Sequence, residues 1–387
     1  MFRKLIVTLV ATLCTGAALA QTTNNAAVEN AAKTSSPVAY VYVARPTHLD
    51  GFAASSNGKL TAVPGSPFTN ISLTHMSVTK KYLFGADSDG QDLDTFSIGS
   101  NGALKEVAQI NAQNYNSDNC GGQGVITLDY TGTTLYNIVN FDCEDAIQSF
   151  KINSNGELGY LGSADSQLPA DLIDLGFPEF VGTNKFAYQI GSGGDGTNDP
   201  YMVRYKRESN GLLAFDGQVT GLPKTKDPQD YYLPFAYAGD PSDHFAMALQ
   251  EFDPIAGEFV GPFEFGSFSV NSSGEIESKS TYENMPSTKL AYISTMSISP
   301  NGKMLAAGSV YGFQVFHFNG SSPITKLSSV LLSGKVVSQF GWDKDNHLYV
   351  LTSDSLHVYE VSSSSVKEVS GSPYSIPEAT SLIVLSM

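Results

Sequence analysis

Histidines and carboxylates are the residue types that could do chemistry in this chain. The sequence holds six histidines but no Gly-x-Ser-x-Gly elbow, His-Glu-x-x-His zinc helix or phosphate-binding glycine loop. Hydrolysis by such a chain needs a base or an activated water, and groups that stabilise an oxyanion. We single out His75 as the candidate base and Glu179 as the carboxylate that would orient it. Whether the two can meet depends on the elements that carry them.

A turn motif repeats along the chain and indicates those elements. It consists of Asn or Ser, then Gly, and Leu or Ile two positions later, with its glycines at Gly58, Gly102, Gly156, Gly211 and Gly274. Asn-Gly supplies the positive φ that tight hairpin turns require. The glycines lie about 44, 54, 55 and 63 positions apart, which suits one four-stranded propeller blade each.

The strand pattern predicts an all-β fold, a seven-bladed β-propeller with four-stranded antiparallel blades. Three-strand groups begin at Tyr40, Tyr82, Leu135, Phe186, Phe245, Met304 and Leu348. A short apolar strand precedes every group except the first, and the C-terminal strand 381–385 supplies the missing one. Closing the first blade in this way removes the free sheet edges. Six or eight blades remain alternatives, because the fourth and fifth blades carry long insertions.

The N-terminus has the features of a cleaved signal peptide over residues 1–20. Arg3 and Lys4 precede the short apolar run Leu5 to Leu13, and Ala18-Leu19-Ala20 offers a cleavage site before Gln21. A lipid anchor at Cys14 is the less favoured alternative. We therefore expect a periplasmic or secreted protein without a membrane span.

The predicted domains follow from composition. Residues 21–36 are mostly Asn, Ala, Thr and Ser, which is typical of a flexible leader, and residues 37–387 form a single propeller domain. The formal net charge of −16 argues against nucleic acid and anionic lipid as partners. Solubility alone and cation binding both account for the acidity. A closed ring needs no partner strand, so we expect a monomer.

Acidic residues gather in the loops predicted on one face. The connection into each innermost strand shares this face with the loop between the second and third strands. Asp87, Asp89 and Asp92 have the oxygen ligands that Ca²⁺ prefers, although the loop's glycine is misplaced for an EF-hand. A solvated acidic turn is the alternative. We expect no required cofactor, with Ca²⁺ as the candidate metal.

Two cysteines remain after signal cleavage, Cys120 and Cys143. Both fall in loops of the third blade on this same face, so we predict a disulfide between them. Metal ligation is a poor alternative, since no nearby histidine completes a ligand set.

Three segments resemble the 6-phosphogluconolactonase-like lactonase propellers. They are Ser-Pro-Asn-Gly-Lys-Met-Leu (299–305), Asn-Gly-Lys-Leu-Thr-Ala-Val-Pro-Gly-Ser-Pro-Phe (57–68) and Leu-Thr-His-Met-Ser-Val (73–78). The resemblance implies lactone hydrolysis in a central funnel, and His75 matches the histidine that such proteins often carry at the start of the innermost strand of the second blade. Their histidine of the third blade is absent here, where the stretch 119–124 includes Gln123.

The substrate that this resemblance implies is an unphosphorylated lactone. Arginines that would bind a phosphate are few, namely Arg45, Arg204 and Arg207. We expect His48, Arg45 and Gln123 to contact the substrate. A partly buried histidine that holds a loop carbonyl is the alternative for His75. The alternative function is a non-enzymatic propeller whose acidic loops hold a protein, a glycan or Ca²⁺.

Overall fold

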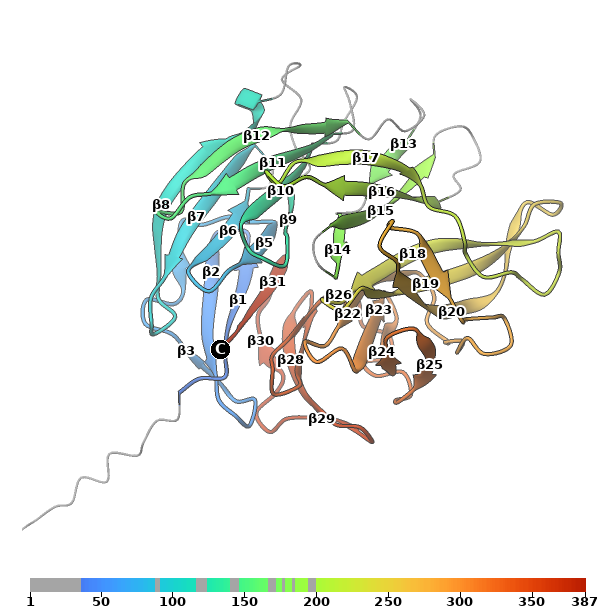
Figure 1. The fold of residues 1–387 in the computed structure, drawn as a ribbon. Helices are drawn as coiled ribbons and strands as arrows, with labels where there is room; N and C mark the ends of the chain where they lie inside the picture. Colours follow the sequence, from blue (N-terminus) through green and yellow to red (C-terminus); the bar gives the residue numbers. More distant parts are fainter. Residues whose placement is uncertain are drawn as a thin grey trace, which may run out of the picture. The chain divides into compact units, whose positions relative to one another are not determined.

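The chain folds as seven antiparallel sheets, each with a path of four strands (Figure 1). The computed structural model describes residues 36–87, 91–115, 124–139, 146–165, 172–175, 178–182, 185–193 and 200–387. The compact unit spans Ser36–Met387. No helix in these ranges is both long and apolar enough to cross a membrane.

The first three blades are built from the N-terminal half of the chain, apart from the C-terminal strand of the first. The first contains β31 (Ser381–Ser386), β1 (Ala39–Arg45), β2 (His48–Ala54) and β3 (Leu60–Ala62), with β4 (Phe68–Thr69) paired to β2. The second contains β5 (His75–Val78), β6 (Tyr82–Ala86), β7 (Asp92–Ile98) and β8 (Leu104–Asn111), followed by the 3₁₀ helix η1 (Ala112–Tyr115). The third contains β9 (Val125–Leu128), β10 (Thr134–Val139), β11 (Ala146–Ile152) and β12 (Leu158–Asp165).

The fourth blade has two short strands in place of one inner strand, and the fifth blade has longer second and third strands than the others. The fourth contains β15 (Phe186–Gly193), β16 (Pro200–Arg207) and β17 (Leu213–Gln218), with β13 (Leu172–Leu175) and β14 (Glu179–Val181) both paired to β15. The fifth contains β18 (Tyr231–Gly239), β19 (His244–Asp253), β20 (Glu258–Val270) and β21 (Ile276–Ser278).

The last two blades complete the ring. The sixth contains β22 (Ile293–Ile298), β23 (Met304–Ser309), β24 (Gly312–Asn319) and β25 (Ser322–Lys326). The seventh contains β26 (Val337–Trp342), β27 (His347–Thr352), β28 (Ser355–Val361) and β29 (Val366–Glu368), with β30 (Tyr374–Ser375) paired to β28.

The ring closes through the C-terminal strand. β31 pairs antiparallel with β1 from Ala39↔Ser386 to Ala44↔Ser381. Among the innermost strands, β31 contacts β5 and β26, β5 contacts β9, β14 contacts β18, and β22 contacts both β18 and β26. Contact between β12 and β17 joins the third and fourth blades. The predicted seven blades and C-terminal closure are therefore confirmed.

The repeated glycine is needed because its turn packs directly on the preceding blade. Gly102 has φ 81°, and a Cβ there would lie 2.5 Å from Tyr40 Cδ1. The Tyr42 hydroxyl also donates to the Gly102 carbonyl at 2.8 Å. Tyr188 makes the same bond to Gly274 in the next blade at 2.7 Å. The turn motif thus fixes both the hairpin and the seam between neighbouring blades.

Candidate functional site

His75 lies on the face that the sequence predicted to carry the site. It is the first residue of β5 and pairs with Ala86, the last residue of β6, just before the loop at 87–91. We call this the upper face. The lower face carries the turns from first to second strand and from third to fourth strand of each blade, such as 79–81 and 99–103.

The His75 ring combines a buried nitrogen without a partner and a hydrogen bond to the backbone. Nδ1 is buried and has no hydrogen-bond partner, while the ring makes a hydrogen bond to the Gly124 backbone. That bond acts to raise the pKa of His75. Burial has the larger effect and lowers the pKa below its ordinary value. At neutral pH the His75 ring is therefore uncharged.

Arg45, His48 and Asp50 form a separate group at the upper end of the first blade. Arg45 and His48 are opposite each other in the β1–β2 hairpin, and Asp50 Oδ2 lies 3.7 Å from Arg45 Nη1 and 3.8 Å from His48 Nε2. Arg45 lies on the same side of the sheet as Val43, which packs with the seventh blade. His75 instead contacts Gly124, at the entry to the third blade. The side chain of Arg45, on the second strand of its blade, therefore points toward the seventh blade. The side chain of His75, on the first strand of its blade, points toward the third blade.

Glu179 occupies a polar site of its own. It begins β14, as predicted, and its Oε1 accepts the Gly239 N–H at 2.8 Å. Burial of the carboxyl raises its pKa to about 7, and the Gly239 bond only partly opposes this. A Cβ added to Gly239 would lie 3.1 Å from both Glu179 Oε1 and the Tyr130 hydroxyl, so the two groups flank the same backbone. Burial and then Glu179 raise the pKa of Tyr130 and of Tyr237.

The structure places Glu179 closer to the lower face than His75. Glu179 pairs with Tyr188, the third residue of β15 counted from the lower face, and Gly239 ends β18 near that face. Within the described ranges, no hydrogen bond joins Glu179 to His75. The catalytic pair therefore stays a prediction, and the neighbours of Glu179 that sequence reasoning missed are Tyr130 and Tyr237. Neither tyrosine is near Glu179 in the sequence, so only the fold reveals the group.

Hydrogen bonds join the described ends of the acidic segment between β6 and β7 in the second blade. Asp87 Oδ1 accepts the Gln91 and Asp92 N–H groups at 2.9 and 3.2 Å, and Asp92 Oδ1 accepts Asn111 Nδ2 at 3.2 Å. Burial raises the pKa of nearby Asp94 to about 6. No group of three potential metal ligands occurs in the part of the chain that the structure describes. The Ca²⁺ site stays a prediction, because Asp89 lies outside the described residues.

Three further predicted residues also lie outside the described ranges. They are Gln123, the expected substrate contact, and Cys120 and Cys143, the expected disulfide. Their pairing and contacts stay predictions.

A cavity of about 740 Å³ opens on the lower face between the first three blades. Its walls include Lys80 and Lys81 from the β5–β6 turn, Asn153 from the β11–β12 turn, and Ser386 at the end of β31. Tyr130 lines the cavity and also flanks Gly239 beside Glu179. The cavity is built from turns far apart in the sequence, and the sequence analysis did not anticipate it.

Comparison with known proteins establishes the fold of this chain but not its sequence family. No protein-family model and no curated protein matches the sequence. A candidate 6-phosphogluconolactonase from Bacteroides fragilis superposes with TM-score 0.63 at 12% identity, covering 92% of this chain and 99% of that one. The periplasmic gluconolactonase of Pseudomonas aeruginosa gives TM-score 0.60 at 11% identity, covering 90% and 99%. The fold is that of the lactonase-like β-propellers. Identities this low establish the fold and leave the activity to the site.

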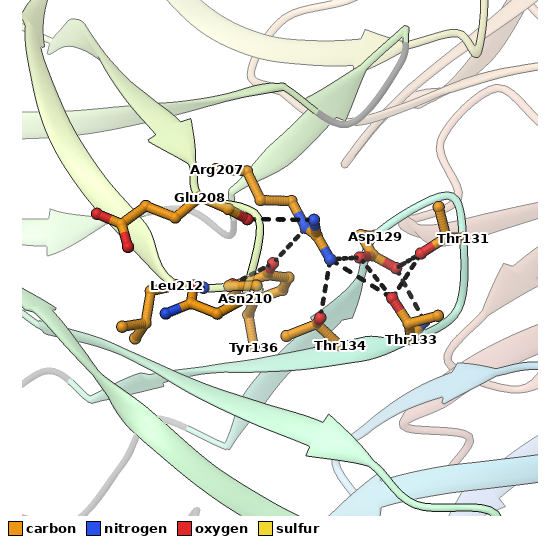
Figure 2. Close-up of polar contacts among 10 residues, drawn as sticks. Asp129, Thr131, Thr133, Thr134, Tyr136, Arg207, Glu208, Asn210 and Leu212 are labelled. Carbon is orange, nitrogen blue, oxygen red and sulfur yellow. Dashed lines mark hydrogen bonds and ion pairs between the residues drawn. The ribbon is translucent and has the colours of Figure 1, made fainter.

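In this propeller, the two arginines of the fourth blade stabilise the contacts between neighbouring blades. Figure 2 shows Arg207 reaching from β16 to the buried carboxylate of Asp129, with Nη2 2.7 Å from Oδ2. Its Nε donates to the Tyr136 hydroxyl at 3.1 Å, and Tyr136 donates to the Gly211 carbonyl at 2.8 Å. Arg207 is therefore part of a structural clamp between the third and fourth blades.

Arg204 is engaged in the same manner. It pairs with Asp216 and Glu275 at 2.8 Å each, and so links the fourth blade to the fifth. Arg45 faces Asp50. Each of the three arginines in the described residues thus has a carboxylate neighbour, at hydrogen-bond distance for Arg204 and Arg207, whereas Arg45 keeps a buried Nε without a hydrogen-bond partner.

Proposed function

We propose that this chain is an exported hydrolase of unphosphorylated lactones, with His75 on the upper face as the general base. The observation that carries the proposal is the unpartnered, buried Nδ1 of His75, whose ring is oriented by the bond to Gly124. A base needs a free lone pair, a fixed orientation and a pKa that leaves it neutral at working pH. His75 is held at Gly124 and has a lowered pKa, and the proposal assigns the free lone pair to Nδ1.

The reaction follows from this arrangement. A water attacks the lactone carbonyl carbon as His75 Nδ1 takes its proton, which gives a tetrahedral intermediate. When the intermediate collapses, the ring C–O bond breaks and the leaving oxygen takes the proton back from His75. The product is an open-chain hydroxy acid, which ionises at neutral pH. No net oxidation occurs and no cofactor is required.

The Gly124 bond also fits a purely structural histidine, which is the alternative reading of His75. The two roles differ in what they require of Nδ1. A histidine that only holds a loop carbonyl gains nothing from a second, buried nitrogen without a partner, because an unsatisfied buried polar atom costs roughly 1–3 kcal/mol. A bound water or substrate at Nδ1 would remove this cost, and the proposal assigns that place to the attacking water.

Two features support the substrate class and the compartment. Arg204 and Arg207 are tied to carboxylates between blades, which disfavours a phosphorylated substrate. The N-terminal signal-like segment supports export, and a periplasmic protein shares the fold. Glu179 enters the proposal as a second titrating group deeper in the channel.

The test is proton release from a panel of unphosphorylated sugar and aliphatic lactones. Wild type is compared with His75→Ala and with the control His317→Ala, a histidine on β24 outside the proposed site. We expect His75→Ala to lower kcat/KM roughly 10²–10⁴-fold. Equal activity of wild type and His75→Ala on a lactone that the protein hydrolyses would remove His75 from the chemistry. No hydrolysis by folded wild type across the panel would count against the lactonase proposal as a whole.

A further inference from the structure

The fifth blade carries a hairpin that is longer than its counterparts. β19 has ten residues and β20 has thirteen, whereas the third strands of the other blades have seven or eight. In Figure 1 these two strands run out beyond the neighbouring blades. The additional length pairs Glu251–Asp253 with Glu258–Val260 and ends in the turn around Ile255.

The tip of this hairpin is rigid. Asp253 Oδ1 accepts the N–H groups of Ile255 and Ala256 at 2.8 and 2.9 Å, and the Gly257 N–H donates to the Asp253 carbonyl at 2.8 Å. Gly257 takes φ 68°, which suits glycine at the end of the turn. Such a turn needs little ordering when a partner binds.

A series of aromatic rings connects the tip to the core. Tyr231 lies 5.6 Å from Phe252, and Phe252 lies 5.2 Å from Phe259, measured between ring centroids. Phe235 continues the series 5.2 Å from Phe259 and 5.1 Å from the buried Phe263. The projecting hairpin is therefore packed onto the blade rather than free to fold back.

The same hairpin exposes large apolar side chains. Ile255 is 78% exposed and Phe259 is 43% exposed, and Tyr231 on the adjacent strand β18 is 38% exposed. A hydrophobic tip on a rigid extension of an otherwise polar surface is typical of an interaction site.

The surroundings of this tip are strongly acidic. The segment 227–264 contains no Lys or Arg. Its carboxylates at the upper end of the blade are Asp227, Asp230, Glu251, Asp253, Glu258 and Glu264. Asp230 and Glu251 share a side-chain hydrogen bond, and desolvation followed by neighbouring carboxylates raises the pKa of both. The carboxyls are thus crowded, and Lys224 and Lys226 precede them in the chain.

We propose that the hairpin of β19 and β20 is a docking surface for a basic, amphipathic segment of another protein. The apolar side chains of such a segment would cover Ile255 and Phe259, while its Lys or Arg residues would meet the crowded carboxylates. Charge complementarity selects this occupant. A second copy of this chain would bring like charges together, and an anionic lipid surface would be repelled.

The test uses a fluorescent twelve-residue peptide of alternating lysine and leucine and the full-length mature chain. Fluorescence anisotropy gives Kd for wild type, for the tip variant Ile255→Ser/Phe259→Ser and for the charge variant Glu251→Gln/Glu258→Gln. Val107→Ser is the matched control, since Val107 is a similarly exposed apolar residue on β8 of the second blade. Polylysine serves as a probe of charge alone.

We expect each hairpin variant to weaken peptide binding at least tenfold, while Val107→Ser leaves Kd unchanged. The tip variant should bind polylysine as wild type does. Equal peptide affinity for the tip variant and wild type would overturn the proposal. Self-association that the tip variant abolishes would overturn it in favour of a second copy. Lactone hydrolysis, measured in parallel, should be unchanged in the hairpin variants, so the two proposals stand or fall separately.

Discussion

Replacing Arg207 by methionine should lower the free energy of unfolding by about 3 kcal/mol, because it leaves the carboxylate of Asp129 buried without its cation. The Asp129 side chain is fully buried and Arg207 is 15% exposed, so solvent cannot take over the role of the guanidinium. Removing one partner of a buried pair costs roughly 3–5 kcal/mol. The lower end applies here, because Asp129 keeps hydrogen bonds from the Thr133 N–H at 3.0 Å and the Thr131 hydroxyl at 2.9 Å.

Urea denaturation followed by intrinsic fluorescence measures the loss. Lys335→Met is the control, because Lys335 and Asp354 form an exposed pair, 56% and 55% accessible, which should contribute at most about 1 kcal/mol. Adding Asp129→Asn to Arg207→Met should restore part of the stability, since the buried charge is then gone. Equal losses for Arg207→Met and Lys335→Met, or a double variant weaker by the sum of both changes, would refute the reasoning.

Three further predictions concern stability and its pH dependence. Gly102→Ala should lower the free energy of unfolding in urea by roughly 2–4 kcal/mol, since alanine at φ 81° is strained and its Cβ meets Tyr40. Gly257→Ala, with open space around it, should lower it by only about 1 kcal/mol. Similar losses for the two variants would count against the packing between blades. Glu179 has a pKa of about 7 in the folded chain, so stability should fall by about 3 kcal/mol as pH rises from 4.5 through 7. Glu179→Gln should flatten that slope, and an unchanged slope would refute the burial of the carboxyl. The lowered pKa of His75 has the opposite effect on stability. The stability that the neutral ring contributes is present above pH 6.5 and is lost as pH falls below it, so His75→Gln should make the chain less sensitive to acid in thermal melts.

The arrangement of the blades was predictable because its signals are local. Asn-Gly or Ser-Gly turns set the outer hairpins of the first five blades, and the innermost strands at Val125 and Glu179 begin where the apolar pattern places them. The exception is the fourth blade, where β13 and β14 together take the place of one inner strand. Glu179, which starts the short apolar run, therefore lies part-way between the upper and lower faces instead of at the upper face. This is the physical reason why Glu179 and His75 occupy different levels.

The candidate site was predictable only in part, since it depends on contacts between blades. The position of His75 on the upper face follows from strand order, but its bond to Gly124 depends on how the third blade packs against the second. Tyr130, which the sequence places in an ordinary turn, becomes a neighbour of Gly239 over a hundred positions away. The lower cavity likewise arises only when the turns of three blades meet.

The most direct test of the central claim is the pH profile of kcat/KM for the best unphosphorylated lactone of the panel, wild type beside His75→Ala. The account predicts an ascending limb with an apparent pKa below 6.5 in the wild type, which disappears together with most of the activity in the variant. The same profile and the same rate in His75→Ala would contradict the assignment of His75 as the base.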